Sequence, residues 1–337
     1  MTESNKCIII AEAGVNHNGR LDLALKLCDK AKEVGADIVK FQAWKTEKII
    51  TRSVAQAEYQ TENTGIEESQ YDMLKRLELS YDDFKIIKKH CDDIGIIFSS
   101  TADEEESLDF LIELGIPFIK VGSGDIGNIS FLRYIGSKKM PVILSTGMST
   151  LADVDISVNA LKEGGATDIT LLHCTTNYPC PYPDVNLNAM LTLKNAFNLP
   201  IGYSDHTLGN EVSIAAVSLG ATVIEKHFTL DCTLDGPDHA ASTNPEDFKK
   251  LVDSIRRVEV CLGDGIKQPT SAEKQISKVV IKHIVAAKEI KKGELFSEDN
   301  LCIKRSDTGI SAARWDEVIG KPALRDYTCD EGIEDIE

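Results

Sequence analysis

The feature that most constrains this sequence is a regular alternation of short apolar runs with longer stretches of helical periodicity. Eight such pairs fit within about 260 residues: 7–14 and 21–35, 36–44 and 81–95, 96–101 and 103–115, 116–125 and 128–139, 141–147 and 151–165, 168–176 and 188–197, and two more within 201–263. Strands that alternate with helices form a parallel sheet covered on both faces, and eight repeats fit a closed (β/α)₈ TIM barrel. An open doubly wound sheet is the alternative. The first predicted strand is not followed by GxGxxG, which argues against the nucleotide-binding form of that sheet.

Polar residues recur where the predicted strands end. They are Glu12, Lys40, Gln42, Ser100, Thr101, Lys120, Ser123, Asp125, Ser145, His173, Thr175, Ser204, His206, Glu225 and His227. Barrel enzymes carry their active sites at the C-terminal ends of the strands. A single serine there is usually a turn residue, but an inward-facing lysine or carboxylate is costly unless it is paired or bound to a ligand. The distribution therefore predicts a functional site at this end of the barrel.

Residues 201–230 hold the most informative side chains, in a strand, a polar turn, a helix and a second strand. Successive side chains of a strand point to opposite faces, so Glu225 and His227 share one face of the second strand. If the two strands are parallel neighbours, His206 lies close to His227. With the nearby carboxylates of Asp205 and Glu225, the two imidazoles form a plausible divalent-metal site with open positions. The alternative is a pair of unrelated polar histidines at strand ends.

The charge balance limits the classes of partner. A formal net charge of −17 argues against a nucleic-acid binder and against docking on an anionic membrane. The sequence has no run of 18 apolar residues, and its N-terminal apolar run is too short for a signal peptide. The nine cysteines are scattered without a CxxC pair. We therefore expect a reduced, cytoplasmic protein.

Two segments depart from the repeat. Residues 45–80 form a polar excursion that is too long for a simple strand-to-helix connection, and we expect it to cover a site. After the barrel, predicted over 1–262, a linker over 263–278 leads to a small β-rich module over 279–337. Arg305 is the residue of this module best placed to reach into a binding site elsewhere. The alternative is a solvated surface position, which is the more common one for an arginine.

Seven ordered motifs, followed by the small module with KKGE and CIKR, resemble the sialic acid synthase family over nearly the whole chain. The motifs are AEAGVNHNG, IVKFQAWK, FIKVGSGD, LSTGMST, GYSDHTLG, VIEKHFTLD and GPDHAAS. The resemblance implies a TIM barrel joined to a C-terminal antifreeze-like (SAF) domain, in a domain-swapped homodimer. It also implies condensation of phosphoenolpyruvate with an N-acylated mannosamine-type sugar, giving a nine-carbon α-keto acid and phosphate.

The same resemblance implies a role for each matching residue. Phosphoenolpyruvate is expected at Lys40, Thr101, Lys120, Ser123, Ser145 and Ser204, and the sugar at Gln42, Tyr178, Asp238 and Arg305, with the arginine supplied by the partner subunit. The catalytic candidates are Glu225, Glu12 and Asp125, and His206 and His227 match the ligands of a divalent ion. Mn²⁺ is favoured, with Mg²⁺ and Co²⁺ as alternatives. Two positions depart from the family: Asp125 stands where some bacterial members have glutamate, and Thr176 or Asn177 stands where an asparagine that contacts phosphate is expected.

The chemistry of the residues agrees with this resemblance. Phosphoenolpyruvate carries up to three negative charges, and inward-facing Lys40 and Lys120 would focus positive potential inside an acidic protein. N-acetylmannosamine is the favoured acceptor, giving N-acetylneuraminate. The alternative is 2,4-diacetamido-2,4,6-trideoxymannose, giving N,N'-diacetyllegionaminate, and residues 57–79 are expected to line the acceptor pocket. More remote alternatives are another metal-dependent barrel aldolase or hydrolase and a carbohydrate- or ice-binding protein without activity.

Overall fold

Eight parallel strands close into a barrel in the computed structural model, which describes residues 6–56, 61, 68–334 and 336. The strands are β1 (Ile8–Gly14), β2 (Ile38–Ala43), β3 (Ile97–Ala102), β4 (Ile119–Val121), β5 (Val142–Ser145), β6 (Ile169–His173), β7 (Ile201–Asp205) and β8 (Val223–His227). Each strand pairs with the next along the chain, and β8 pairs with β1. The predicted TIM barrel is therefore confirmed, and the open sheet is excluded.

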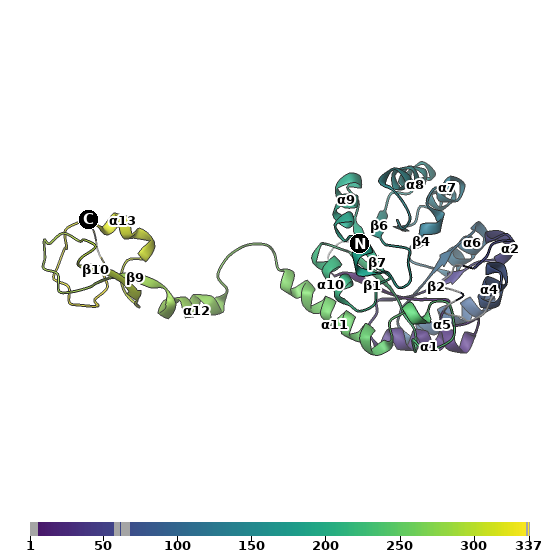
Figure 1. Ribbon diagram of the computed structural model, residues 1–337, viewed down its shortest axis with the longest axis horizontal. Coiled ribbons are helices and arrows are strands. Elements are labelled where there is room, and N and C mark those ends of the chain that lie inside the picture. The colour runs from purple at the N-terminus through teal and green to yellow at the C-terminus, as the bar shows by residue number, and fades with distance from the viewer. Residues whose placement is uncertain (1–5, 57–60, 62–67, 335, 337) are drawn as a thin grey trace. The chain divides into compact units, whose positions relative to one another are not determined.

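Helices surround the barrel (Figure 1). They are α1 (Leu21–Glu33), α2 (Thr46–Ile49), α4 (Gln70–Leu77), α5 (Tyr81–Ile94), α6 (Glu105–Leu114), α7 (Ile129–Ser137), α8 (Leu151–Gly164), α9 (Asn188–Phe197), α10 (Glu211–Ser218) and α11 (Pro245–Leu262). Local sequence explains where they begin and end: α5 starts at a capping box of Ser80 and Asp83 and stops at Gly95, which has φ of 73°. No helix in the described part of the chain is long and apolar enough to cross a membrane.

The barrel interior has an apolar layer below a charged one. The apolar layer consists of Ile10, Ile38, Phe118, Ile143, Leu172 and Val223. Because side chains on one face of a strand recur every second residue, the next inward positions are two residues further along. Those positions hold Glu12, Lys40, Lys120, Ser145 and Glu225, all buried. The strand pattern therefore carries buried charges to the C-terminal end of the barrel, where each must find a partner.

Strand register aligns these buried groups across the barrel wall. Glu12 on β1 lies opposite Lys40 on one side and His227 on the other. Ser204 on β7 lies opposite Glu225 on β8. The first and last strands of the barrel thus contribute neighbouring residues to the same site.

The polar excursion between β2 and α5 contains α2 and α4. Ser69 caps α4 by accepting a hydrogen bond from the backbone N–H of Asp72. Residues 57–60 and 62–67, which belong to the stretch predicted to line the acceptor pocket, lie outside the described residues.

The chain divides into two compact units between Gly263 and Asp264. The second unit contains α12 (Ser271–Val280), the antiparallel strands β9 (Lys282–Ala286) and β10 (Leu301–Arg305), and α13 (Trp315–Val318). Its small core includes Ile284, Phe296 and Tyr327. The predicted linker is partly helical, because α12 lies mostly within it. Its start has a capping box of Thr270 and Glu273, a signal that was present in the sequence.

Candidate active site

Glu225 lies between two buried lysines at the C-terminal end of the barrel. Its carboxylate oxygens are 3.3 Å from the Nζ of Lys120 and 3.7 Å from the Nζ of Lys40. Lys40 also contacts Glu12, with Nζ and Oε2 2.5 Å apart. All four side chains are at most 7% exposed. Two cations and two carboxyl groups therefore share one desolvated space, where their mutual pairing keeps the burial tolerable.

The two carboxyl groups have opposite tendencies to bind a proton. Burial opposes the ionisation of Glu225, but the charges of Lys120 and Lys40 outweigh it and lower the pKa of Glu225 to about 2. Burial raises the pKa of Glu12 to about 7, partly offset by the attraction of Lys40 and reinforced by the charge of Glu225. Neighbouring carboxyl groups whose pKa values are pushed apart are typical of acid–base sites. Glu225 is thus the ionised member of the pair near neutral pH.

Hydroxyl groups surround the two lysines. Lys40 donates to the Oγ1 of Thr101 at 2.9 Å, and Lys120 donates to the Oγ of Ser145 at 2.8 Å. Ser204 donates to Glu225 at 3.2 Å. The Oγ of Ser123 accepts a hydrogen bond from the backbone N–H of Gly147 at 2.9 Å, next to the same site. The positive charges and the hydroxyl groups together suit an anion with several oxygen atoms.

His206 and His227 lie side by side, with ring centroids 5.6 Å apart. The Nδ1 of His206 donates to the carbonyl oxygen of Thr175 at 2.7 Å, so its Nε2 presents a lone pair. Burial lowers the pKa of His206. Burial and then His206 lower the pKa of His227 to about 3, and the Nδ1 of His227 has no hydrogen-bond partner among the described residues. Both imidazoles are therefore neutral, the form that binds metals.

This pair fits a divalent ion with an incomplete protein coordination shell. The bond from His206 to a backbone carbonyl fixes the tautomer and the ring orientation, as is usual for a metal-binding histidine. Within the described residues there is no group of three or more His, Cys, Asp or Glu side chains that could hold a metal. The chain would thus supply two imidazoles, leaving the remaining positions to water and substrate, as in open catalytic sites.

Three of the four residues predicted to bind the sugar lie beside the two histidines and Glu12. The ring of Tyr178 is 4.2 Å from that of His206, measured between centroids. The Oδ2 of Asp238 is 3.9 Å from the Nδ1 of His227, and burial raises the pKa of Asp238 to about 6. Gln42 donates to Glu12 at 3.0 Å. Tyr178 and Asp238 therefore border the histidines, and Gln42 borders Glu12.

Three other predicted positions have different surroundings. Asp125, in a 3₁₀ turn after β4, is partly buried and accepts a hydrogen bond from Asn128 at 3.1 Å; burial raises its pKa. Thr176 and Asn177 are both exposed after β6. A Cβ at Gly147 would lie 2.3 Å from the Oγ1 of Thr176, which places Thr176 next to the loop after β5.

Arg305 belongs to the second unit. It ends β10, where it pairs with Lys282 of β9, and its side chain is exposed. Its predicted role in a partner's site stays a prediction.

The position of Asp205 was predicted wrongly. Its carboxylate lies on the outer face of β7, where it binds Lys226 at 2.9 Å, away from the histidines. The reason is the strand alternation itself, since Ser204 and His206 take the inner face.

Asp103 was missed in the sequence. It follows β3 two residues after Thr101, so it continues the inward-facing series. Burial and then Asp125 raise its pKa to about 7, and among the described residues its carboxyl has no hydrogen bond or ion pair. Its strand phase was the signal that could have identified it.

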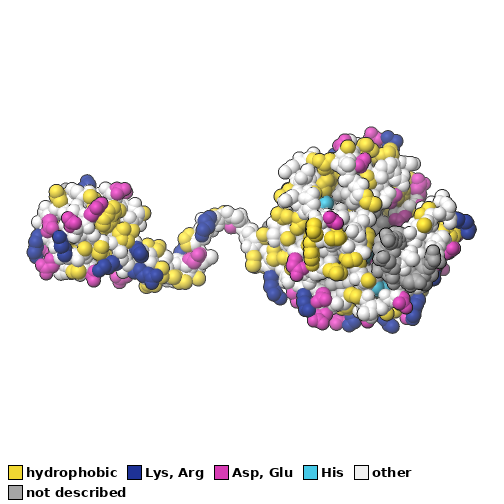
Figure 2. All heavy atoms as spheres, in the orientation of Figure 1, with side chains coloured by type: hydrophobic (Ala, Val, Ile, Leu, Met, Phe, Trp, Pro, Cys, Tyr) yellow, Lys and Arg dark blue, Asp and Glu magenta, His cyan; other side chains and the backbone are white. Residues whose placement is uncertain are grey.

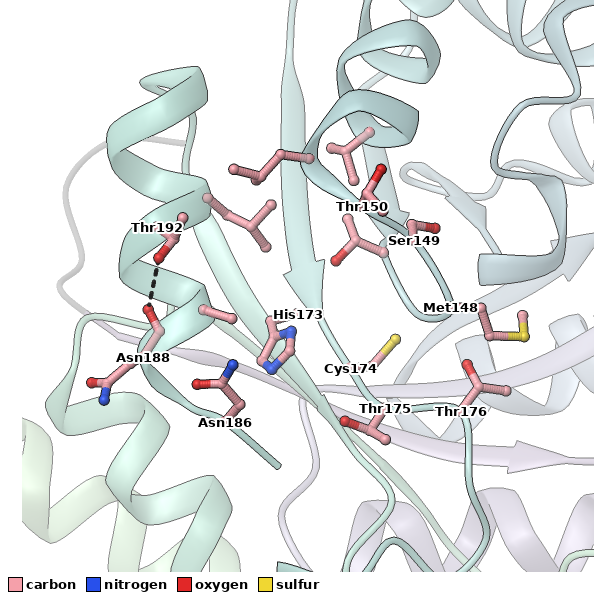
Figure 3. Close-up of a pocket in the computed structure, with 15 residues that line it drawn as sticks. Met148, Ser149, Thr150, His173, Cys174, Thr175, Thr176, Asn186, Asn188 and Thr192 are labelled. Carbon is pink, nitrogen blue, oxygen red and sulfur yellow. Dashed lines mark hydrogen bonds between the residues drawn. The ribbon is translucent and has the colours of Figure 1, made fainter. Parts of the chain in front are cut away.

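A separate cavity of about 570 Å³ opens between α8 and α9 beside the end of β6. His173 projects into it from the outer side of β6, with Asn186 and Asn188 on one side and Ser149 and Thr150 on the other (Figure 3). None of its described lining residues carries a formal charge. Its lining includes none of Lys40, Lys120 and Glu225, so it is not the site of the buried lysines.

Comparisons with known proteins agree on one relationship. Residues 27–267 match the NeuB family, and residues 282–334 match the SAF domain. The chain is 48% identical to an N,N'-diacetyllegionaminic acid synthase of Campylobacter jejuni over 97% of this chain and 99% of that protein. It is 47% identical to the protein of the same name from Legionella pneumophila over 94% and 90%. A crystal structure of N-acetylneuraminic acid synthetase from Leptospira borgpetersenii, in complex with citrate, aligns with a TM-score of 0.71 at 35% identity over 81% of this chain and 91% of that one.

Proposed function

The chain belongs to the NeuB family and ends in an SAF domain, and on this basis we propose that it condenses phosphoenolpyruvate with an N-acylated mannosamine-type sugar, releasing phosphate. The observation that carries this proposal is the buried group of Lys40, Lys120 and Glu225 directly beside two neutral histidines. Two desolvated lysines are suited to binding an anionic substrate, whereas the two histidines are suited to holding a metal ion that acts as a Lewis acid. A reaction between an anionic enol and an aldehyde needs both.

Phosphoenolpyruvate is expected to bind at the two lysines. Their ammonium groups would hold its phosphate and carboxylate, and Thr101, Ser145 and Ser204 would donate hydrogen bonds to the same oxygens. Substrate charge would then replace part of the present pairing with Glu12 and Glu225. The two ammonium groups already lie close together where the substrate needs positive charge.

The acceptor aldehyde is expected beside the histidines. A divalent ion held by His206 and His227, with Mn²⁺ as the favoured ion, would polarise the aldehyde oxygen. The enol carbon of phosphoenolpyruvate attacks the aldehyde carbon, and the resulting cationic carbon takes up water before phosphate leaves. Glu225, ionised by its two lysines, is placed to accept a proton during these steps.

We favour 2,4-diacetamido-2,4,6-trideoxymannose as the acceptor, with N,N'-diacetyllegionaminate as the product. The sequence alone favoured N-acetylmannosamine. Two relatives at 48% and 47% identity are N,N'-diacetyllegionaminic acid synthases, whereas the N-acetylneuraminic acid synthetase is 35% identical. N-acetylmannosamine is the second candidate because that more distant relative also aligns over most of the chain.

A direct comparison of acceptors tests this proposal. With phosphoenolpyruvate and Mn²⁺ present, we expect kcat/KM for the diacetamido sugar to exceed that for N-acetylmannosamine by about 100-fold, the scale at which one polar group and one small apolar group discriminate substrates. Phosphate release is the measurement, with each substrate omitted in turn. Equal or reversed preference would return the assignment to N-acetylneuraminate, and phosphate release without any sugar would indicate a hydrolase.

We also propose that the active site is shared between two chains of a homodimer. Helix α12 has no buried residue in this chain, and Ile276, Val279 and Val280 are 56%, 67% and 42% exposed. Figure 2 shows hydrophobic side chains on the surface of this helix. Apolar surface of this kind is typical of a segment that packs against another chain. Arg305 of one chain would then hydrogen-bond the sugar in the barrel of its partner, a role suited to its planar guanidinium.

Mixing two inactive variants distinguishes a shared site from a self-contained one. Arg305→Ala and His227→Ala subunits are combined under conditions in which subunits exchange. If the site is shared, one barrel of each mixed dimer has both groups, so random exchange should restore about a quarter of the wild-type activity. Activity that stays at background while exchange is demonstrated, for example with differently tagged chains, would show that Arg305 does not act on the partner's barrel.

A further inference from the structure

A second buried ion pair lies directly behind the two histidines, on the outer face of the barrel wall. Asp205 and Lys226 face each other in the register of β7 and β8, and their side chains are 0% and 2% exposed. The Nζ of Lys226 donates to the Oδ2 of Asp205 at 2.9 Å. Each of these residues is a chain neighbour of one histidine: Asp205 precedes His206, and Lys226 precedes His227.

The pair extends the connection between β7 and β8 beyond the point where their strand pairing ends. The last paired positions are Asp205 and Lys226, so His206 lies one residue past the end of the pairing. Lys226 donates a second hydrogen bond, at 2.7 Å, to the carbonyl oxygen of Thr207. The ammonium group therefore binds the residues on both sides of His206, and it does so from the residue next to His227.

The carboxylate of Asp205 holds the same turn from the other direction. Its Oδ1 accepts from the backbone N–H of Thr207 at 2.9 Å and from its hydroxyl at 2.7 Å. Its Oδ2 accepts from Ser213 of α10 at 2.5 Å as well as from Lys226. Both carboxylate oxygens therefore have two donors, which connects the end of β7, the end of β8 and the start of α10.

The hydrogen bonds of the Asp205–Lys226 pair matter most for the orientation of the His227 ring. Its Nδ1 has no hydrogen-bond partner among the described residues, whereas His206 is oriented through Thr175. The ring of Tyr178 contacts both imidazoles, and the backbones that carry the two rings also contribute to the spacing between them. Those backbones are connected at this level by the Asp205–Lys226 pair.

We propose that the Asp205–Lys226 ion pair is a positioning element that sets the spacing of His206 and His227 for a divalent ion. The inference rests on the metal role assigned to these histidines under the proposed function. Neither Asp205 nor Lys226 touches the ion or the substrates. Their effect passes through the backbone on either side of each ligand.

Metal affinity measured without turnover tests this role. The variants are Asp205→Asn, Lys226→Met and the double variant, and free Mn²⁺ is measured by electron paramagnetic resonance during titration of the substrate-free protein. We expect the dissociation constant for Mn²⁺ to rise at least tenfold, the scale seen when groups that orient metal ligands are removed. In assays, the Mn²⁺ concentration for half-maximal activity should rise in parallel, while the KM for phosphoenolpyruvate at saturating Mn²⁺ stays within about twofold of wild type.

The double variant distinguishes a loss of Mn²⁺ affinity from a loss of folding. A single substitution leaves one buried charge unpaired, whereas Asp205→Asn with Lys226→Met removes both charges. Asp37→Asn is the matched control, because Asp37 accepts from the backbone of Ile9 at 2.9 Å and from Arg256 at 2.5 Å, away from the histidines. It should lower the melting temperature without changing Mn²⁺ affinity.

Two results would overturn the inference. An unchanged Mn²⁺ dissociation constant in the folded double variant would show that the pair serves stability alone. If the wild-type protein binds no Mn²⁺ that His227→Ala abolishes, the metal assignment fails and this inference fails with it. A wild-type protein that binds Mn²⁺ through His227 while the double variant binds it equally well would leave the proposed function standing and refute the positioning role.

Discussion

Replacement of His227 by alanine is expected to reduce turnover by about three orders of magnitude or more and to abolish Mn²⁺ binding. A bound ion that polarises a carbonyl lowers the barrier by several kcal/mol, and each 1.4 kcal/mol corresponds to about a tenfold change in rate. With only two imidazoles available from the described chain, loss of one leaves a single protein ligand. Initial rates of phosphate release and direct Mn²⁺ titration are the two measurements.

His90→Ala provides the matched control for this prediction. His90 lies on α5, partly exposed, where its ring nitrogen is 2.7 Å from Asp29. This variant should keep wild-type turnover and Mn²⁺ affinity. Full activity of the wild-type enzyme in excess chelator would refute the metal requirement, whatever the effect of the alanine substitution.

Lys120→Met is expected to raise the KM for phosphoenolpyruvate by about 100-fold. Loss of one partner of a buried, hydrogen-bonded charge pair costs about 2–5 kcal/mol of binding free energy, and about 1.4 kcal/mol corresponds to a factor of ten. Methionine preserves most of the side-chain volume while removing the ammonium group. The exposed Lys89→Met on α5, which removes an ion pair with Asp93, should leave the KM unchanged.

The same variant should shift the pH profile in a defined direction. Burial works against ionisation of Glu225, and Lys120 is the strongest of the charges that oppose this effect. Without Lys120, the pKa of Glu225 rises, so the acidic limb of kcat/KM should move to higher pH. A profile and a KM that both match wild type would show that Lys120 does not face the substrate.

The barrel could be predicted from the sequence because its signal is local and repeated. Strand alternation also identified the inward-facing groups: Ser204, His206, Glu225 and His227 do lie on the faces that a period of two assigns to them. Their proximity followed from one further assumption, that β7 and β8 are neighbours, which the observed pairing supports.

Strand alternation gives the face on which a residue lies, but its partners depend on contacts between distant segments, which no local pattern reports. The partner of Asp205, Lys226, lies on another strand, and Ser213, which also donates to Asp205, lies on α10. The neighbourhood of Asp103 likewise depends on Asp125 from the next strand-to-helix loop. Helix α12 is a different case. Its capping box is visible in the sequence, but the loss of the strand–helix alternation led to the prediction of a linker there.

The pairing of β1 with β8 has a consequence for the order of assembly. Glu12 and His227 are neighbours only after the last strand has docked on the first, although almost the whole barrel sequence separates them. A nascent chain that has folded through β7 therefore has Lys40 and Lys120 but lacks Glu225, their shared counter-charge, and has one of the two histidines. Such distant contacts form late, after the loop-closure entropy has been overcome. If the two histidines hold Mn²⁺, only protein in which the barrel has closed completely should retain the ion. Folding intermediates that lack β8 would then be both metal-free and inactive.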